Sequence, residues 1–428
     1  MNLYCVVRLS GTLCLVLAML SIPSAIGRSE GNLAPDSGPA SLAASLSDLQ
    51  GTGRVTSIVS SPPQVIEYLK KKGQPLPRLD RFKTSPSPVK PRKLQGTVNL
   101  LAILVDFSGT PGTVTNLTVL DNLVFAAPVS GRGSVRDYYD EVTRSTVTIA
   151  TVNLPSTTGW QHAWQTMAYY ANNQYGMGNT FPQNAAGYVV EAIGQVDPLV
   201  NFANYDNDGD GAIDSLLVIH AGTGAEWSTN PNHIQSHASY ISWMGGTPPT
   251  LDGVLVDRYV TVPEYLEPGL IGPGTTDMTI GVLCHEVAHG LFGLPDLYDL
   301  DYSSAGIGQW GLMSYGDWNG PAKWNSFLGL WVTDGSSPAW PEAWSRILLG
   351  WDNATLVMNP MSNLCLAPAE TTPDTVLRFK STGLRSQEYF LVENRQQNAI
   401  PNGYDQYLPG SGLLILSLIH ISEPTRLL

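Results

Sequence analysis

The sequence has 428 residues, of which 43% are hydrophobic and 14% are charged. That length accommodates about two or three domains, and the composition excludes a globally disordered chain. The 23 basic and 36 acidic residues give a net charge of −13. Residues 1–95 hold 12 of the basic and only 5 of the acidic residues, so residues 96–428 carry a net charge of −20. This acidic body argues against binding to nucleic acid or to an anionic membrane.

The N-terminus has the pattern of an export signal. Arg8 supplies a positive charge, Leu9–Ile22 form a short apolar run, and small residues lead to a cleavage site expected after Gly27. A membrane anchor is the alternative, but the run is shorter than the roughly 20 residues of a spanning helix, and no later segment is long and apolar enough to span. We therefore predict a signal peptide at residues 1–27 and a secreted, extracellular protein without a membrane span.

Residues 28–95 are rich in Ser, Pro and Lys and are interpreted as a pro-segment, with Pro91–Lys93 as the expected cleavage region. A basic segment beside an acidic body suggests that the two associate before the segment is removed. The alternative is a disordered linker. Folded structure is expected to begin at Gly96.

Beyond Gly96, apolar and β-branched runs alternate with helical patterns. The predicted elements are a buried strand at Val98–Val105, a helix at Ser134–Thr143 capped by Ser134, a strand at Val147–Val152, a helix at Ala185–Val196 and a buried strand at Ser215–His220. Such alternation predicts an α/β core. We place a catalytic domain at residues 96–354 and, because strand and turn patterns dominate, a β-rich region at residues 355–415.

One segment carries a pattern typical of zinc hydrolases. His285, Glu286 and His289 lie within Asp277–Leu291, which is predicted to be a helix that ends before Gly293. Histidines four residues apart lie on one helix face and can bind one metal ion. Zinc lowers the pKa of a bound water toward about 7, so an adjacent carboxylate can take its proton. The alternative is a pair of surface histidines.

Zinc in a catalytic site needs a third protein ligand. No Glu occurs between Glu286 and Glu342, which disfavours the thermolysin-like arrangement. A Gly and then an acidic residue follow the motif instead, which resembles the metzincin plan with Asp in place of a third His. Asp296 is the predicted ligand, and Asp299 is the alternative.

A second motif, Trp310–Gly316, resembles the Met-turn that places a methionine, here Met313, beneath the metal. Tyr315 stands where some metzincins keep a tyrosine near the zinc, and we predict that it stabilises the oxyanion. The alternative is a core methionine and a packed tyrosine.

Together these motifs resemble the immune inhibitor A-like family of secreted metalloproteases. The resemblance covers roughly residues 96–415 and rests on Cys284–Glu286, Gly293–Asp299, Met313, Ser134–Tyr139, Pro341–Ser345, Leu349–Trp351 and Glu388–Arg395. It implies a zinc endopeptidase with a removable pro-segment and a metzincin-like fold. This chain has three residues between His289 and Gly293 where the family more often has two, an addition that a local bulge would absorb. Residues 416–428 depart from the family pattern and are interpreted as an artefactual tail of a truncated chain, so His420 is expected to have no function.

A further acidic segment predicts a calcium site. Asp206, Asp208, Asp210 and Asp214 supply oxygen ligands, and Gly211 permits a sharp turn. The position of the bidentate Glu of an EF-hand is occupied by a leucine, so the loop is not a complete EF-hand. The alternative is a polar turn.

The sequence thus predicts a secreted zinc endopeptidase that acts on proteins or peptides. A non-catalytic secreted binding protein on a protease scaffold is the main alternative, which the intact His285, Glu286 and His289 disfavour. A zinc hydrolase for other esters or amides is a third possibility. After signal removal, Cys284 and Cys365 are left to pair or to stay free.

Overall fold

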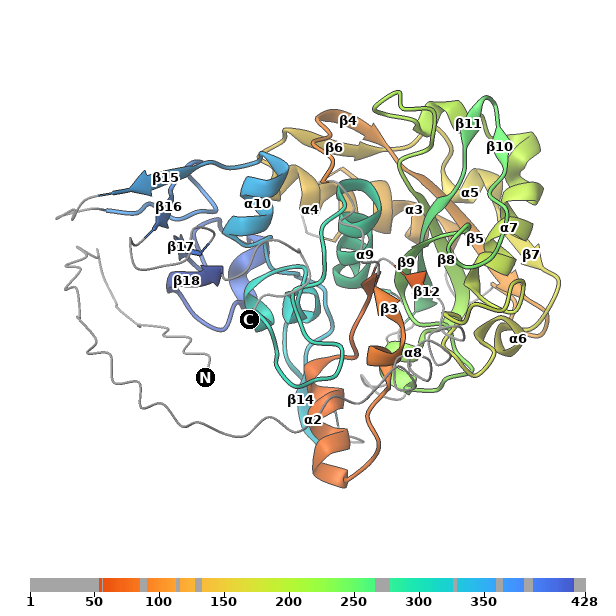
Figure 1. The fold of residues 1–428 in the computed structure, drawn as a ribbon, viewed down its shortest axis with the longest axis horizontal. Helices are drawn as coiled ribbons and strands as arrows, with labels where there is room; N and C mark the ends of the chain where they lie inside the picture. Colours follow the sequence, from red (N-terminus) through yellow and green to blue (C-terminus); the bar gives the residue numbers. More distant parts are fainter. Residues whose placement is uncertain are drawn as a thin grey trace, which may run out of the picture.

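The computed structural model of the chain describes residues 54–55, 57–84, 91–112, 116–127, 133–265, 278–325, 329–358, 365–380 and 388–418. The predicted signal peptide and His420 lie outside these residues. A six-stranded sheet forms the centre of the body, in the order β2-β9-β12-β8-β5-β7 (Figure 1). Its strands are β2 (Ser57–Ile58), β5 (Leu101–Phe107), β7 (Trp160–Ala163), β8 (Leu216–Thr223), β9 (His237–Tyr240) and β12 (Arg258–Tyr265). Strands β7, β5, β8 and β12 are parallel, whereas β9 is antiparallel to both β12 and β2.

Both faces of this sheet are buried, as expected for parallel strands covered by helices. Every residue of β5 is buried. Ala102 and Leu104 point into the core on one face, and Ile103 and Val105 point into the core on the other. The first core receives side chains of α3 (Leu117–Phe125), α4 (Val135–Val142) and α9 (Ile280–Val287), and the second receives those of α6 (Met167–Ala171) and α7 (Ala185–Val196). The predicted mixed α/β architecture is therefore confirmed.

The helix predictions in the body agree closely with the structure. Helix α7 has the predicted bounds, and Ser134 caps α4 by accepting a hydrogen bond from the Asp137 N–H at 2.9 Å. The single strand predicted at Val98–Val105 is wrong, because the chain changes sheets at Leu100. Residues before it form β4 (Gly96–Asn99), which pairs with β6 (Val147–Ala150), and those after it form β5.

The expectation that folded structure begins at Gly96 is also wrong. Within the predicted pro-segment lie β1 (Arg54–Val55), β2, α2 (Pro63–Lys72), η2 (Leu79–Arg81) and β3 (Lys83–Thr84). Short apolar groups in an otherwise polar stretch anchor it, since Ile58, Val59, Ile66 and Leu79 are buried against the two cores. The segment therefore packs on the body and adds a strand to its sheet.

The smaller elements connect these layers. They are α5 (Pro155–Thr158), α8 (Ala225–Ser228), α10 (Ala343–Leu349), the hairpins β10 (Thr250–Leu251) with β11 (Val254–Leu255) and β13 (Lys323–Asn325) with β14 (Leu330–Val332), and the short helices η3 (Asp197–Leu199), η4 (Phe202–Tyr205), η5 (Ala288–Phe292), η6 (Gly308–Trp310), η7 (Tyr315–Trp318) and η8 (Tyr404–Tyr407). In the described part of the chain, every helix is too short or too polar to cross a membrane. Cys284 and Cys365 are free thiols, the first buried and the second exposed.

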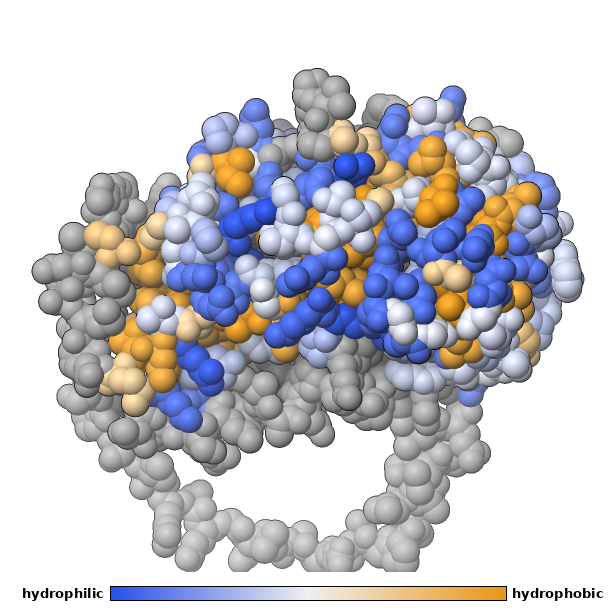
Figure 2. Space-filling view, turned by 90° about the horizontal axis from the view of Figure 1, so that it is seen from above, coloured by the Kyte–Doolittle hydropathy of each residue, from blue (hydrophilic) through white to orange (hydrophobic). Residues whose placement is uncertain are grey.

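The region predicted to be β-rich forms a four-stranded sheet of β15 (Ala354–Val357), β16 (Val376–Phe379), β17 (Tyr389–Arg395) and β18 (Gly412–Leu418), in that order. Strand β18 pairs with β17 through Leu418, so the sheet includes the first three residues of the predicted tail. Apolar residues gather on the surface at this end of the molecule (Figure 2). The side chains of Leu356 and Met358 in this region are 51% and 72% exposed.

Buried charges fasten this sheet to the rest of the body. On β17, Glu393 accepts a hydrogen bond from Arg346 of α10 at 2.9 Å. Arg395 binds the Asp405 carboxylate at 2.6 Å and donates to the Trp310 carbonyl at 3.0 Å. All four charged side chains are buried. Trp310 is the first residue of the Met-turn motif, so this hydrogen bond connects the sheet to that turn.

Candidate metal centre

Helix α9 carries the first part of the centre. It begins at Ile280, because Thr279 has extended backbone angles, φ −96° and ψ 164°. The described residues Met278 and Thr279 are not helical, so the helix begins later than predicted, and the predicted start at Asp277 lies outside the described residues. The Gly281 N–H donates to the Gly335 carbonyl at 2.9 Å, and a Cβ on Gly281 would lie 1.8 Å from the Asp317 carbonyl oxygen. Only glycine permits this close approach between the helix entry and the loop beside it.

A π-helical turn, η5, follows α9 directly and contains His289. Such a turn holds one more residue than an α-helical turn, so it accommodates the additional residue between His289 and Gly293, as the predicted bulge would. Its freed carbonyls have donors, since Gly290 accepts from Arg258 at 2.9 Å and Phe292 accepts from the Arg92 N–H at 3.0 Å. Gly293 ends the helix in the left-handed region with φ 69°.

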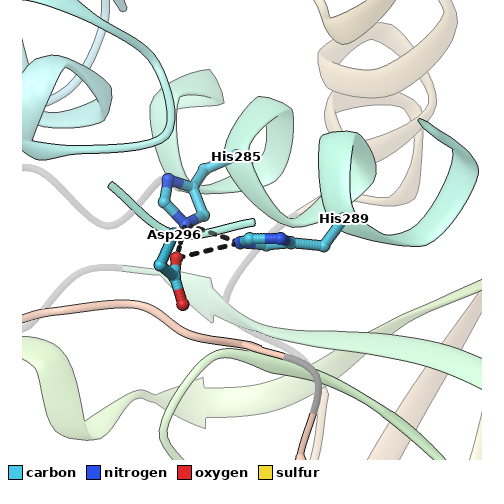
Figure 3. A group of neighbouring side chains, drawn as sticks. All are labelled: His285, His289 and Asp296. Atoms are coloured by element: carbon cyan, nitrogen blue, oxygen red, sulfur yellow. Dashed lines mark hydrogen bonds and ion pairs between the residues drawn. The ribbon is translucent and has the colours of Figure 1, made fainter. Parts of the chain in front are cut away.

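The side chains of His285, His289 and Asp296 converge (Figure 3). One carboxylate oxygen, Oδ1 of Asp296, lies 3.0 Å from Nε2 of His285 and 3.1 Å from Nε2 of His289. The two Nε2 atoms lie 2.9 Å apart. Glu286 is fully buried beside them on α9. The carboxylate of Asp299 instead accepts a hydrogen bond from the Ser303 hydroxyl at 3.2 Å.

Hydrogen bonds at the far side of each ring indicate its tautomer. His285 Nδ1 donates to the Leu312 carbonyl at 2.9 Å, and His289 Nδ1 donates to the Leu294 carbonyl. We assign the protons to Nδ1, which leaves a lone pair on each Nε2. Two lone pairs and a carboxylate oxygen then face one point, an arrangement that repels itself unless a cation lies between them.

The spacing of these three atoms fits a metal ion. Ligands about 2.0–2.1 Å from a tetrahedral zinc ion lie about 3.3 Å from one another, close to the 2.9–3.1 Å separations of the three atoms. Burial raises the pKa of Asp296, but positive charge on the facing His289 and His285 rings lowers it by more, so a cation at this point keeps the group a carboxylate. The donor set is therefore suited to a divalent cation such as zinc.

The turn predicted to lie beneath the metal packs against this group. Met313 is fully buried, and its carbonyl accepts from the Leu297 N–H at 2.7 Å. The Tyr315 ring stacks on the Tyr298 ring with centroids 5.6 Å apart. Asp317 Oδ2 lies 3.8 Å from His285 Nδ1, and burial raises the pKa of Asp317 to about 8 although His285 opposes this.

Sequence reasoning did not identify Tyr298 or Asp317 as residues of this centre. Tyr298 belongs to the Gly293–Asp299 run that carries the family resemblance, so this run could have identified it as a residue of the centre. Asp317 follows the Met-turn without a spacing rule that singles it out.

Strand β2, within the predicted pro-segment, lies against this centre. Strand β2 pairs with the edge strand β9, with Ile58 opposite His237. The Ile58 N–H donates to Asp296 Oδ2 at 3.3 Å, and the Trp318 indole donates to the Ser60 carbonyl at 3.2 Å. Residues 57–60 therefore occupy the space in front of the candidate metal ligands.

The acidic loop forms a separate cluster. Carboxylate oxygens of Asp206, Asp208 and Asp210 lie within 4.8 Å of one another. Asp214, predicted as a fourth ligand, lies outside this group. Its Oδ1 binds Arg92 at 2.6 Å, and its Oδ2 accepts from the backbone and side chain of Asn207, both at 2.8 Å. Arg92, in the expected cleavage region, is thus held against the body.

Comparison with known proteins places this geometry in a family. The model of the immune inhibitor A peptidase M6 catalytic domain matches residues 121–334, which include both histidines, Asp296 and Met313. The chain belongs to this family. Its relatives include the Pre-pro-metalloprotease PrtV of Vibrio cholerae serotype O1, 29% identical over 215 residues, and Immune inhibitor A of Bacillus thuringiensis subsp. alesti, 33% identical over 140 residues.

These matches are partial. The PrtV match covers 44% of this chain and 21% of PrtV, and the Immune inhibitor A match covers 28% of this chain and 18% of that relative. The chain thus spans about a fifth of the length of these relatives.

The buried His237 on β9 predicts that the fold near the candidate metal centre loses stability in acid. Burial lowers the pKa of His237 from 6.5 to about 4. The unfolded chain therefore takes up this proton at higher pH than the folded chain, so the stability is complete above pH 6.5 and is lost as the pH falls toward 4. We expect His237 to cost the fold about 2 kcal/mol between pH 7 and pH 5.

Urea unfolding at pH 7 and pH 5 measures this cost. His237→Gln keeps a polar side chain at this position but cannot take up the proton, so its free energy of unfolding should fall by about 2 kcal/mol less than that of the wild type over this interval. An equal fall in both proteins would contradict the assignment.

Proposed function

We propose that this protein is a secreted zinc endopeptidase with a metzincin-like catalytic domain. The convergence of His285, His289 and Asp296 beside the buried Glu286 carries the proposal. Membership of an M6 peptidase family supports a peptidase rather than a binding protein. The mixed sheet, in which β9 runs antiparallel to β12, and the turn at Met313 support the metzincin-like assignment.

In the proposed mechanism, the three ligands are held in place before substrate binds, because the Leu312 and Leu294 carbonyls fix the two imidazoles. A zinc ion held there supplies Lewis acidity and lowers the pKa of a water molecule toward about 7. Glu286 takes a proton from the attacking water and passes it to the leaving amine. Strand β9 offers its edge to an extended peptide, as it does to β2. The oxyanion also needs a donor, a role that the sequence pattern suggests for Tyr315 and that the Tyr315→Phe variant tests.

The first test addresses the general base. Glu286→Gln should lower kcat for hydrolysis of casein by about 10²–10⁴-fold, because the amide cannot accept the proton. A zinc chelator should abolish hydrolysis by the wild type, and added zinc should restore it. Glu191→Gln, on α7 at the other face of the sheet, is the control and should retain wild-type activity. Wild-type rates from Glu286→Gln would exclude this mechanism.

The second test addresses the ligands. Loss of a partner outside the ligand shell typically costs about 10–100-fold in metal affinity. We therefore expect Asp296→Ala to weaken zinc binding by more than about 100-fold, measured by competition with a chelating dye. Asp299→Ala is the matched control, because its carboxylate contacts Ser303 instead. Equal zinc affinity in Asp296→Ala and the wild type would remove Asp296 from the ligand set.

We further propose that the cluster of Asp206, Asp208 and Asp210 binds calcium. Its support is the proximity of three carboxylates around Gly209 and Gly211, which both have positive φ. Asp208→Ala therefore serves as a second control in the zinc measurement. It should keep zinc affinity and lose calcium in metal analysis, and retention of calcium would contradict the proposal.

The predicted pro-segment is proposed to keep the enzyme latent. Residues 57–60 support this, because they cover the site and their strand occupies the edge of β9. Ile58→Pro removes the N–H that donates to Asp296 and disrupts the strand, at a cost of about 1–3 kcal/mol. The uncleaved variant should therefore hydrolyse a short fluorogenic peptide about tenfold faster, or more, than the uncleaved wild type.

The control for latency is Lys72→Ala, an exposed substitution at the end of α2 in the same segment, which should leave the rate unchanged. Gel electrophoresis after the assay verifies that each chain is uncleaved. If the uncleaved wild type hydrolyses the peptide as fast as the processed enzyme, the segment does not impose latency.

A further inference from the structure

The backbone of residues 58–60 is bound at every polar group by the body of the protein. The three N–H groups donate to Asp296 Oδ2 at 3.3 Å, to the Ser236 carbonyl at 3.0 Å and to the Tyr298 hydroxyl at 3.1 Å. The three carbonyls accept from Tyr298, from Gln235 at 2.7 Å and from Trp318 at 3.2 Å. These contacts do not depend on which side chains the bound segment carries, so they are contacts that any extended peptide can make.

Tyr298 holds a particular place among these donors. The Tyr298 hydroxyl donates to the Ile58 carbonyl, and the N–H of Ile58 donates to Asp296. The carbonyl bound by Tyr298 therefore belongs to the residue that lies directly against the candidate metal ligands. Both partners of the Tyr298 hydroxyl belong to residues 58–60, so release of this segment leaves the hydroxyl facing the site.

We propose that Tyr298 is a further catalytic residue, which donates a hydrogen bond to the oxygen of the scissile carbonyl, and that Ile58 occupies the position of the substrate residue that contributes this carbonyl. The inference rests on the peptidase function proposed above. It assigns to Tyr298 the donor role that the sequence pattern suggests for Tyr315.

The contacts of the two stacked tyrosines distinguish them. Tyr298 binds backbone atoms, which every peptide substrate supplies. The neighbour of the Tyr315 hydroxyl is instead the side chain of Ser60, which lowers the Tyr315 pKa while burial raises it by more, and a substrate provides such a neighbour only if it has a polar residue at that position. The Tyr315 ring packs on the Tyr298 ring and so helps to hold it.

The chemistry needs no change in the protonation of Tyr298. As the water oxygen bonds to the carbonyl carbon, the carbonyl oxygen gains negative charge, and the hydrogen bond from Tyr298 strengthens. When the C–N bond breaks, the oxygen returns to a carbonyl or carboxylate, and Glu286 delivers the water's proton to the amine. A donor to such a developing charge is worth about 10²–10³-fold in kcat.

The experiment compares Tyr298→Phe with Tyr315→Phe in the full chain after release of its pro-segment. We expect Tyr298→Phe to lower kcat for a fluorogenic peptide by about 10²–10³-fold with KM and zinc content near wild type, because only the transition state gains this bond strength. Tyr315→Phe should keep kcat within about threefold. Wild-type kcat in Tyr298→Phe, or the large loss in Tyr315→Phe instead, would overturn the proposal.

A binding measurement separates this inference from the function on which it rests. A phosphinic peptide carries a charged tetrahedral centre that resembles the transition state, and calorimetry measures its affinity without turnover. Its Kd should rise in Tyr298→Phe by about the factor lost from kcat/KM, as expected for transition-state binding. An unchanged Kd would overturn the role of Tyr298 alone. An active Glu286→Gln or a chelator-resistant wild type would instead overturn the peptidase mechanism.

Discussion

The structure depends on holding two unprotonated imidazole nitrogens and one carboxylate oxygen at a single point. In a buried site, this arrangement has a high electrostatic cost unless a cation is shared among the three groups. Backbone atoms hold the three groups in this arrangement. The carbonyls of Leu312 and Leu294 bind Nδ1 of the two histidines, so each Nε2 presents its lone pair toward Asp296. The tautomers are set by the turns on either side of Asp296 and do not require a ligand to select them.

Those two carbonyls must in turn be fixed. Leu312 belongs to the turn before Met313, and the residue that begins this turn region, Trp310, accepts a hydrogen bond from the buried Arg395 of the C-terminal sheet. Leu294 follows Gly293, whose left-handed conformation ends the π-helical turn. The β-rich region is therefore coupled to the metal centre through Arg395 and the turn at Met313.

The sequence predicted most of the centre and little of what surrounds it. Helical spacing alone places His285 and His289 on one face with Glu286 adjacent, and the acidic residues after Gly293 lead to Asp296, with Asp299 as the alternative. The π-helical turn was expected only as a bulge, because the residue count shows an extra residue but not where the helix widens. Tyr298 lay in a recognised run, yet its role depends on Ile58, which is 240 positions away and was assigned to a segment expected to be unfolded.

The same limit explains why the start of folded structure was misplaced. Residues 54–84 contain too few apolar side chains to form a core of their own, so composition gave no reason to expect folded structure before Gly96. Ile58 and Val59 are buried because β2 pairs with β9 and groups of the body bind their backbone. A pro-segment of this kind needs little sequence information, since backbone groups carry most of its recognition.

Recognition through backbone groups also affects how the enzyme binds its substrates. A peptide bound through its backbone by β9, Gln235, Trp318 and Tyr298 can have many sequences. Selectivity then depends on the few side-chain contacts beside this site. The pro-segment then restrains the enzyme by the same interactions that a substrate uses, held in addition by the packing of α2 and its flanking residues against the body. Its removal exposes the edge of β9 and the hydroxyl of Tyr298 in one step. Latency and catalysis are thereby linked through a single set of hydrogen-bond donors.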